Sequence, residues 1–493
     1  MNQSIQNMVL RKIVVLVMCL AAIANAQTVL TLDQALEFAM EKSPEIRQAK
    51  LSLEHSKQNL NAENARLKSH FGLNLTPFSF SRERTFDQRY SDWYDTQMKL
   101  LSARFYITQP IVLTDGTLEL TNRFSWQDHS YEQGPISGGS TTFNNNLYLS
   151  FKQPIFTYNR TKLALKSLKL DLENSALFYA IKNLNLEKSV NQQFYDVYYR
   201  KMSLNITEEE FKNNQESYQI IKNKVEAGIS AKEELYQAEL NLANSRTNVQ
   251  NVRVGLENAM DDFKILLGLP IDHEITVVAD VSFQQIAVDE SKATENALKF
   301  RMELRQRDIN IQNAMANLIE TSALNEFKGN LSVTYGLVGT NEDFPQMYDD
   351  PDQSQEFSVS FEVPLWDWGE KKARIRAAKA TIDQRHLDKE SEESNLRVAL
   401  RKAYRSLKNQ LSQIDIARQN VKNAELTYEI NLERYKNGDL TSKDLGYYQN
   451  QLSREKLGYI EALINYKLAL LDIKIQSLWN FEKNASVVPE ITF

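Results

Sequence analysis

Two very long stretches without glycine or proline constrain this 493-residue chain more than any other feature. Residues 161–227 and residues 370–437 contain neither residue type. At a rise of 1.5 Å per residue, a helix of this length extends roughly 100 Å, which no globular core requires. Each stretch ends at a glycine, Gly228 or Gly438, the residue most common where a helix ends in a left-handed turn. The chain is therefore predicted to be mainly α-helical and elongated.

The two stretches belong to an internal repeat. A displacement of 210 residues aligns residues 147–156 (LYLSFKQPIF) with residues 357–366 (FSVSFEVPLW), and it also aligns Gly228 with Gly438. A displacement of 258 residues aligns residues 35–47 with residues 293–305. The difference between the two displacements indicates a 48-residue insertion in the first half, within about residues 76–142. We predict two repeats, residues 27–270 and residues 271–493, each containing helices and strands, with strands near residues 71–157 and 330–366.

Heptads follow each terminal glycine. Leu235, Leu242 and Leu256 are spaced by multiples of seven, and Leu445 and Leu452 repeat the pattern in the second half. This spacing indicates returning helices that pack side by side as coiled coils. A solid bundle or a rod would give the same heptads, so the helices alone do not establish a hollow tube.

Alternating segments lie between the helices. Leu147, Leu149 and Phe151 alternate with polar residues, and so do the residues around Val333 and Val359. Such alternation is typical of membrane barrel strands, and also of a soluble sheet packed on a core. We predict four main strands per chain, too few to close a barrel, and an open sheet edge is not tolerated in lipid. Three copies would supply twelve strands, so the predicted fold is a trimeric 12-stranded β-barrel continued by a helical barrel.

The first 26 residues have the pattern of a secretory signal peptide. Arg11 and Lys12 precede an apolar run that ends at an A-x-A cleavage site, residues 24–26. Cleavage would remove Cys19, the one cysteine, so the mature chain would have no disulfide. Lipid attachment at Cys19 is the alternative, although Met18 is not the small residue that normally precedes a lipidated cysteine.

The composition argues against several functional classes. Without the first 26 residues, 56 basic residues stand against 64 acidic residues, a net charge of −8 that disfavours a nucleic-acid partner. The five histidines are scattered and none has a partner at metal-ligand spacing, so neither a metal site nor a cofactor is predicted. No nucleophile, phosphate-binding or zinc-protease motif is present, and an enzyme is not expected.

The order and duplication of these motifs resemble the TolC-like outer-membrane efflux protein family over essentially the whole mature chain. The strand-to-helix motif occurs twice, at residues 151–156 and 361–369, and the tip motif occurs twice, at residues 225–228 and 434–438. The resemblance implies a homotrimer with a barrel in the outer-membrane lipid of a Gram-negative bacterium and a long periplasmic helical tunnel. It also implies docking on a periplasmic adaptor (membrane fusion) protein that leads to an inner-membrane pump of the RND or ABC type. The function implied is passive export of small molecules such as drugs; type I protein secretion is an alternative, and so is a structural periplasmic coiled-coil protein.

The same resemblance implies residues for a gate at the periplasmic tips. Tyr435 and Glu234 would form a polar link that holds the closed state, and Asp444 would line the constriction. Leu440 stands where some relatives have a gate-linking arginine, and Tyr447 where some have a second aspartate ring. The turns expected to dock on the adaptor are formed by Gly228, Gly438, Leu235 and Leu445. The alternative for Asp444 and Glu234 is an ordinary solvated charge near a turn, and Asp439 could equally cap the returning helix.

The position of the 48-residue insertion, between the first two strands, predicts an extracellular location for it. It would form either a long loop or an added hairpin with strands near residues 103–107 and 117–124. The pattern does not decide between the two.

Overall fold

The computed structural model describes residues 28–88, 91–133 and 136–489. The expected signal peptide, with Cys19, lies outside the described residues. The elements in chain order are β1 (Thr28–Leu30), α2 (Leu32–Lys42), α3 (Pro44–Arg66), β2 (His70–Asp87), β3 (Asp92–Ile111), β4 (Gly116–Gln133), β5 (Ile136–Ile155), α4 (Arg160–Glu226), α5 (Lys232–Leu267), β6 (Ile275–Val277), α6 (Glu290–Phe300), α7 (Met302–Ser322), β7 (Lys328–Asn341), η1 (Pro345–Tyr348), β8 (Asp352–Glu362), α8 (Glu370–Asn437), α9 (Ser442–Ser477), β9 (Trp479–Asn480) and β10 (Ala485–Ser486).

The two predicted long helices are confirmed as α4 and α8, with 67 and 68 residues. The chain divides into two compact units, and each unit draws on both predicted repeats. The helical unit contains the described residues up to Leu53, Ser175–Gln306 and the residues from Lys389 onward; the sheet unit contains Glu54–Asn174 and Arg307–Asp388. The division into repeats stays a prediction, which the recurring order of two short helices, strands and two long helices supports.

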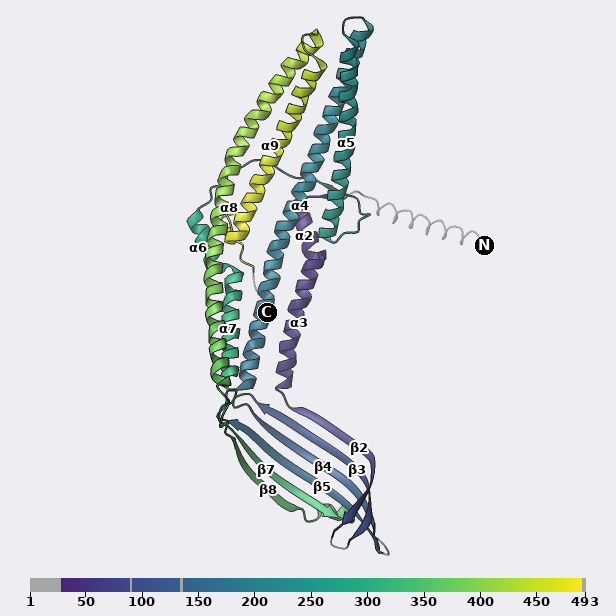
Figure 1. The fold of residues 1–493 in the computed structure, drawn as a ribbon, viewed down its shortest axis with the longest axis vertical. Helices are drawn as coiled ribbons and strands as arrows, with labels where there is room; N and C mark the ends of the chain where they lie inside the picture. The colour runs from purple at the N-terminus through teal and green to yellow at the C-terminus, as the bar shows by residue number, and fades with distance from the viewer. Residues whose placement is uncertain (1–27, 89–90, 134–135, 490–493) are drawn as a thin grey trace, which may run out of the picture. The chain divides into compact units, whose positions relative to one another are not determined.

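In the helical unit, α5 runs back along α4, and α9 runs back along α8 (Figure 1). The largest core cluster, around Phe194 and Phe263, joins α4 to α5 and includes α2 and the parallel β1–β6 pair. A second core, around Ile414 and Tyr466, joins α8 to α9. No helix in the described part of the chain is both long enough and apolar enough to cross a membrane.

The sheet unit contains one antiparallel sheet of six strands in the order β2-β3-β4-β5-β7-β8 (Figure 1). The expectation of four main strands per chain was therefore wrong, and the total of twelve strands that rests on it no longer follows. Because neighbouring strands are antiparallel, the start of β2, the end of β5, the start of β7 and the end of β8 lie at one end of the sheet. We call it the helix end, because the chain continues there into α3, α4, α7 and α8.

The 48-residue insertion accounts for the two strands beyond the expected four. Of the two alternatives left open, a long loop or an added hairpin, the structure has the hairpin, since Ala103 pairs with Phe124 and Ile107 pairs with Leu120. Its two strands, however, are 20 and 18 residues long and lie in the middle of the sheet. Their connecting turn is at the helix end, so the insertion is not confined to the opposite end of the sheet; its extracellular location stays a prediction. The expected hairpin strands, residues 103–107 and 117–124, cover only part of β3 and β4, because polar residues interrupt the period-2 pattern in the rest of each strand.

Candidate functional site: the two faces of the sheet and the helical tips

Apolar side chains form one face of the sheet across all six strands. The register aligns Leu118 with Phe151, Phe151 with Val333, and Val333 with Phe357. We call this the apolar face; its large side chains are solvent-exposed in the single chain, and they include Phe71, Leu73, Leu75, Phe105, Leu118, Leu120, Leu147, Leu149, Val333, Tyr335, Phe357, Val359 and Phe361. An exposed apolar surface of this extent indicates contact with lipid or with a partner. The alternation predicted for the strands near Leu147, Val333 and Val359 is confirmed.

The opposite, polar face carries hydroxyl, amide and charged groups. Ser150 and Thr334 are joined by a hydrogen bond of 3.0 Å between their hydroxyl oxygens, and the Thr121 hydroxyl donates to Glu119 at 2.8 Å. Three glycines on this face, Gly72, Gly138 and Gly336, each lie beneath a tyrosine ring of the neighbouring strand. These rings cover the sheet at positions where any larger residue would collide with them. One face thus suits hydrocarbon and the other suits water, which is the arrangement of a membrane barrel wall.

The apolar face ends abruptly away from the helix end. In β4 it extends over nine residues, from Leu118 to Trp126, with one polar residue, Asn122, which donates a hydrogen bond to Asn145 of β5; Asp128 follows. Nine to eleven residues are the usual length of a strand that crosses a bilayer. Beyond this level the same face carries ion pairs, Lys99–Asp128 at 3.0 Å and Arg82–Asp95 at 2.8 Å. This face therefore changes from apolar to charged residues at one level of the sheet.

At the tips of the helical unit, both connections have the same backbone turn. Gly228 has φ +73° and Gly438 has φ +92°, which favours glycine at both positions. In each turn the next residue donates back into the helix, Ile229 to the Lys224 carbonyl at 2.8 Å and Asp439 to the Arg434 carbonyl at 2.9 Å. Each turn thus ends its long helix, α4 or α8, in the same way.

Polar contacts join the two tips. The Tyr435 side chain, 1 % exposed, donates its hydroxyl to the Ser217 carbonyl at 3.2 Å and lies 3.3 Å from the Ser442 hydroxyl. Glu234 accepts a hydrogen bond of 2.7 Å from the Ser442 amide. The Lys224 ammonium donates to the Tyr435 carbonyl at 2.8 Å. Burial raises the pKa of the Tyr435 hydroxyl, which therefore remains a donor at neutral pH.

The structure brings Tyr435 and Glu234 together, but through Ser442. The expected direct hydrogen bond between the two side chains is replaced by a contact of each with this serine. The tyrosine is held in an apolar cluster with Ile221, Ala238 and Leu445, and its hydroxyl contacts the Ser217 carbonyl and the Ser442 hydroxyl in place of the carboxylate. Sequence reasoning missed Ser442, Ser217 and Lys224, because a serine or lysine near a turn carries no distinctive pattern.

The other predicted tip residues divide into buried and exposed groups. Leu445 is 4 % exposed and Leu235 and Leu440 pack on the same apolar cluster, so these leucines support the tips from inside. Tyr447 is 65 % exposed. Asp444 is also exposed, and its carboxylate accepts a hydrogen bond of 2.8 Å from Thr441, the residue that caps α9. The alternative cap, Asp439, is not used. A cleft of about 420 Å³ between the tips is lined by Lys224, Glu234, Tyr435, Leu440, Asp444 and neighbouring residues.

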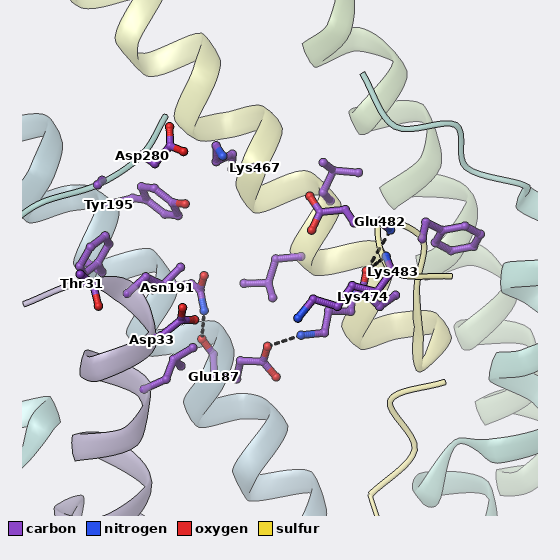
Figure 2. A pocket seen from close by; sticks show the side chains of 18 of the residues that line it. Thr31, Asp33, Glu187, Asn191, Tyr195, Asp280, Lys467, Lys474, Glu482 and Lys483 are labelled. Carbon is purple, nitrogen blue, oxygen red and sulfur yellow. Dashed lines mark hydrogen bonds and ion pairs between the residues drawn. The ribbon is translucent and has the colours of Figure 1, made fainter. Parts of the chain in front are cut away.

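A larger pocket of about 560 Å³ lies elsewhere in the helical unit, between α4 and α9 (Figure 2). Ion pairs join these helices beside it, Lys474–Glu187 and Lys188–Asp472, each at 2.6 Å. Burial raises the pKa of Tyr195, on the pocket wall, to about 12. Lysines and carboxylates alternate around the pocket, and the described residues contain no metal-binding cluster of histidine, cysteine and carboxylate groups.

Comparison with known proteins gives one family and one fold. A family model described as "Outer membrane efflux protein" matches residues 117–269 and 293–474, more than half of the chain. The Campylobacter jejuni CmeC outer membrane channel has a similar structure, with a TM-score of 0.69 and 16% identity over 93% of this chain and 87% of that chain. The Neisseria gonorrhoeae MtrE outer membrane channel, solved in an open state, has a TM-score of 0.66 and 14% identity over 90% of this chain and 88% of that chain. The outer membrane protein VceC of Vibrio cholerae has a TM-score of 0.66 and 12% identity, with coverage of 90% and 96%. A comparison with curated protein sequences found no match.

Proposed function

Because this chain belongs to the outer membrane efflux protein family, we propose that three copies form the exit duct of a tripartite efflux system. The family consists of non-enzymatic transport ducts in the outer membrane that extend into the periplasm. In the proposed system an inner-membrane pump supplies the energy, a periplasmic adaptor links the pump to the duct, and small molecules such as drugs leave passively.

The two-faced sheet is the observation that carries the proposal. Its apolar face extends through six strands, whereas the opposite face carries mostly hydroxyl, amide and charged groups. A soluble rod has no use for an exposed apolar surface of this size. The open edges of the sheet cannot exist in lipid and require further copies of the chain to close a barrel.

The tips support a gated entrance. The contacts through Ser442 hold the α4–α5 connection against the α8–α9 connection. A few hydrogen bonds of about 1 kcal/mol each hold a closed state that an adaptor can open by binding the open state more tightly. The exposed turns at Gly228 and Gly438, with Ile229 at 74 % exposure, form the proposed docking surface for the adaptor.

The test is purification in detergent followed by insertion into planar bilayers. We expect a trimer that aggregates when the detergent is withdrawn and that produces discrete conductance steps. A stable, detergent-independent monomer without channel activity would support the structural coiled-coil protein instead. The cargo is set by the pump, so neighbouring coding sequences distinguish the two transport roles. A proton-driven pump favours drug efflux, and an ABC transporter beside a secreted protein favours protein secretion.

A further inference from the structure

The inserted β3–β4 hairpin lies within the wall of the sheet. β3 pairs with β2 along its length, and β4 pairs with β5 in unbroken register from Thr117 to Gln133. Each inserted strand therefore has hydrogen-bonded neighbours on both sides. A hairpin folded over the outside of a barrel would leave β2 and β5 paired directly with each other.

The inserted strands also carry the lipid-facing pattern. Leu101, Phe105 and Ile107 of β3 and Leu118, Leu120 and Trp126 of β4 lie on the apolar face. The residues between them on the opposite face include Arg104, Arg123 and Thr121. Because the pattern matches that of β5 and β7 at the same level of the sheet, both inserted strands are built to cross the hydrocarbon layer.

The inner turn of the hairpin is fixed to the start of α4. Asp115 accepts hydrogen bonds from the Arg160 and Thr161 amides, at 3.3 and 3.0 Å, and so caps the helix. Asn159 donates in return to the Val112 and Leu113 carbonyls, at 2.8 and 3.1 Å. These contacts attach the turn of the hairpin to the start of α4, the helix that follows β5. The attachment holds the inserted strands in the wall.

The two outer edges of the sheet are compatible with each other. Among the described strands, β2 and β8 each have a partner on one side only, and their apolar side chains are among the most exposed of the sheet, with Phe71 at 69 % and Phe357 at 71 %. β2 runs away from the helix end and β8 runs toward it. Because six is an even number, β8 of one copy meets β2 of the next copy in antiparallel orientation, as in the rest of the sheet.

We propose that β8 of each copy pairs with β2 of the next copy, so that three copies close a barrel of eighteen strands. The inference rests on the proposed trimeric duct and deepens it by setting the width of its outer part. Barrel diameter grows roughly in proportion to strand number. With strands about 4.8 Å apart and tilted by about 40°, eighteen strands give a backbone diameter of about 36 Å, against about 24 Å for twelve strands.

The same geometry gives the barrel an uneven outer rim. β8 has 11 residues and matches only the membrane-crossing part of β2, which has 18 residues. The remaining residues of β2, which include Arg82 and Arg84, extend past the end of the apolar residues and away from the helix end. The long strands β2–β5 of one copy therefore lie next to the shorter strands β7 and β8 of its neighbour.

Engineered cysteines test the pairing of the edges, since the one native cysteine lies in the expected signal peptide. Ser358 of β8 and Asn74 or Thr76 of β2 lie on the polar face within the membrane-crossing part. We expect oxidation of Ser358→Cys with Asn74→Cys, or with Thr76→Cys, to give covalent dimers and trimers in at least one combination. Ser358→Cys with Thr121→Cys, in the interior strand β4, is the matched control and should stay monomeric in denaturing gels.

Electron cryo-microscopy of the detergent-solubilised assembly tests the strand number. Eighteen strands and a diameter near 36 Å are expected. A channel-forming trimer with twelve wall strands, or without cross-links in either edge combination, would overturn the inference and leave the proposed duct intact. A twelve-stranded dimer would overturn the inference and the proposed trimer together, and a monomer without conductance would overturn the proposed function itself.

Discussion

The two helical tips share a backbone turn but use equivalent residues differently. Glu234 and Asp444 are 210 residues apart and occupy the same position in the two repeats. Glu234 accepts its hydrogen bond from Ser442 in the other repeat, whereas Asp444 bonds to Thr441 in its own repeat. In both contacts the charged side chain comes from the first half of the chain: Lys224 donates to the Tyr435 carbonyl, and Glu234 accepts from the Ser442 amide. The two turns thus have the same backbone conformation, whereas the carboxylates at equivalent positions beside them have different partners.

Removing the contacts between the tips has the largest expected effect. Tyr435→Phe with Glu234→Ala deletes at least two hydrogen bonds in each copy. At about 1 kcal/mol per bond, and with half of the loss appearing in the open–closed equilibrium, three copies shift it by about 3 kcal/mol, roughly 100-fold. We expect higher single-channel conductance in bilayers and greater drug permeability of cells.

The control for this variant uses the equivalent carboxylate. Asp444→Ala removes a charge at the same turn but leaves the bond from Ser442 to Glu234 in place. Its closed state should be nearly as stable as that of the unaltered protein. Equal conductance in the double variant and the unaltered protein would show that packing around Tyr435, and not the polar contacts, holds the tips together.

Asp444 and Glu234 should also differ in how they act on cations. The Asp444 carboxylate is exposed at the tip, whereas Glu234 is partly buried and occupied by the Ser442 amide. Three exposed carboxylates around an entrance attract multivalent cations. We predict that Asp444→Asn weakens block of the channel by such cations by about tenfold, and that Glu234→Gln changes it little, as measured by titration in bilayers. An equal loss in both variants would remove the distinction between the two positions.

Helix length, the repeat and the two-faced strands were predictable because each depends on a regular local pattern. Glycine-free and proline-free runs predicted α4 and α8 to within a residue or two. The strand number was not predictable in the same way. A long twisted strand such as β3 mixes Gln97, Lys99 and Arg104 with apolar residues, and only its pairing on both sides identifies it as part of the wall.

The tip site was only partly predictable. Its position followed from the two glycines, and Tyr435 was identified with its partner carboxylate close by. The connection through Ser442 depends on how α8 and α5 pack within the helical unit, and spacing along one chain contains no information on that contact. The resemblance supplied residue positions, and the structure supplied the hydrogen bonds.

Helix capping gives a smaller difference between the tips. Thr441 accepts a hydrogen bond from the Asp444 amide at the start of α9, whereas Ala231 at the start of α5 makes no side-chain cap. Thr441→Val should therefore destabilise the first turn of α9 by about 1 kcal/mol, and Ala231→Ser should stabilise α5 by about 0.5–1 kcal/mol. Hydrogen exchange of the first-turn amides measures both. Unchanged protection in both variants would mean that tertiary contacts, and not the caps, set the stability of these turns.

The smallest expected effect concerns a buried carboxylate that only the first repeat has. Glu210 is 9 % exposed on α4, while the equivalent residue of the second repeat, Asn420, is exposed. Burial raises the pKa of Glu210 above its ordinary value of 4.5, and a hydrogen bond with Ser453 opposes the shift in part. A raised pKa in the folded state means that this group favours folding below about pH 4.5, and that the benefit is lost as the pH rises through the folded-state pKa.

Glu210→Gln removes the titration and retains a group that can bond to Ser453. The variant should be more stable than the unaltered protein at pH 7 by about 1 kcal/mol or less, and the difference should disappear near pH 4, as measured by thermal unfolding in detergent. Asn420→Gln, on the exposed equivalent, should change neither value, and a stability loss in Glu210→Gln at pH 7 would show that the charged form of Glu210 is needed.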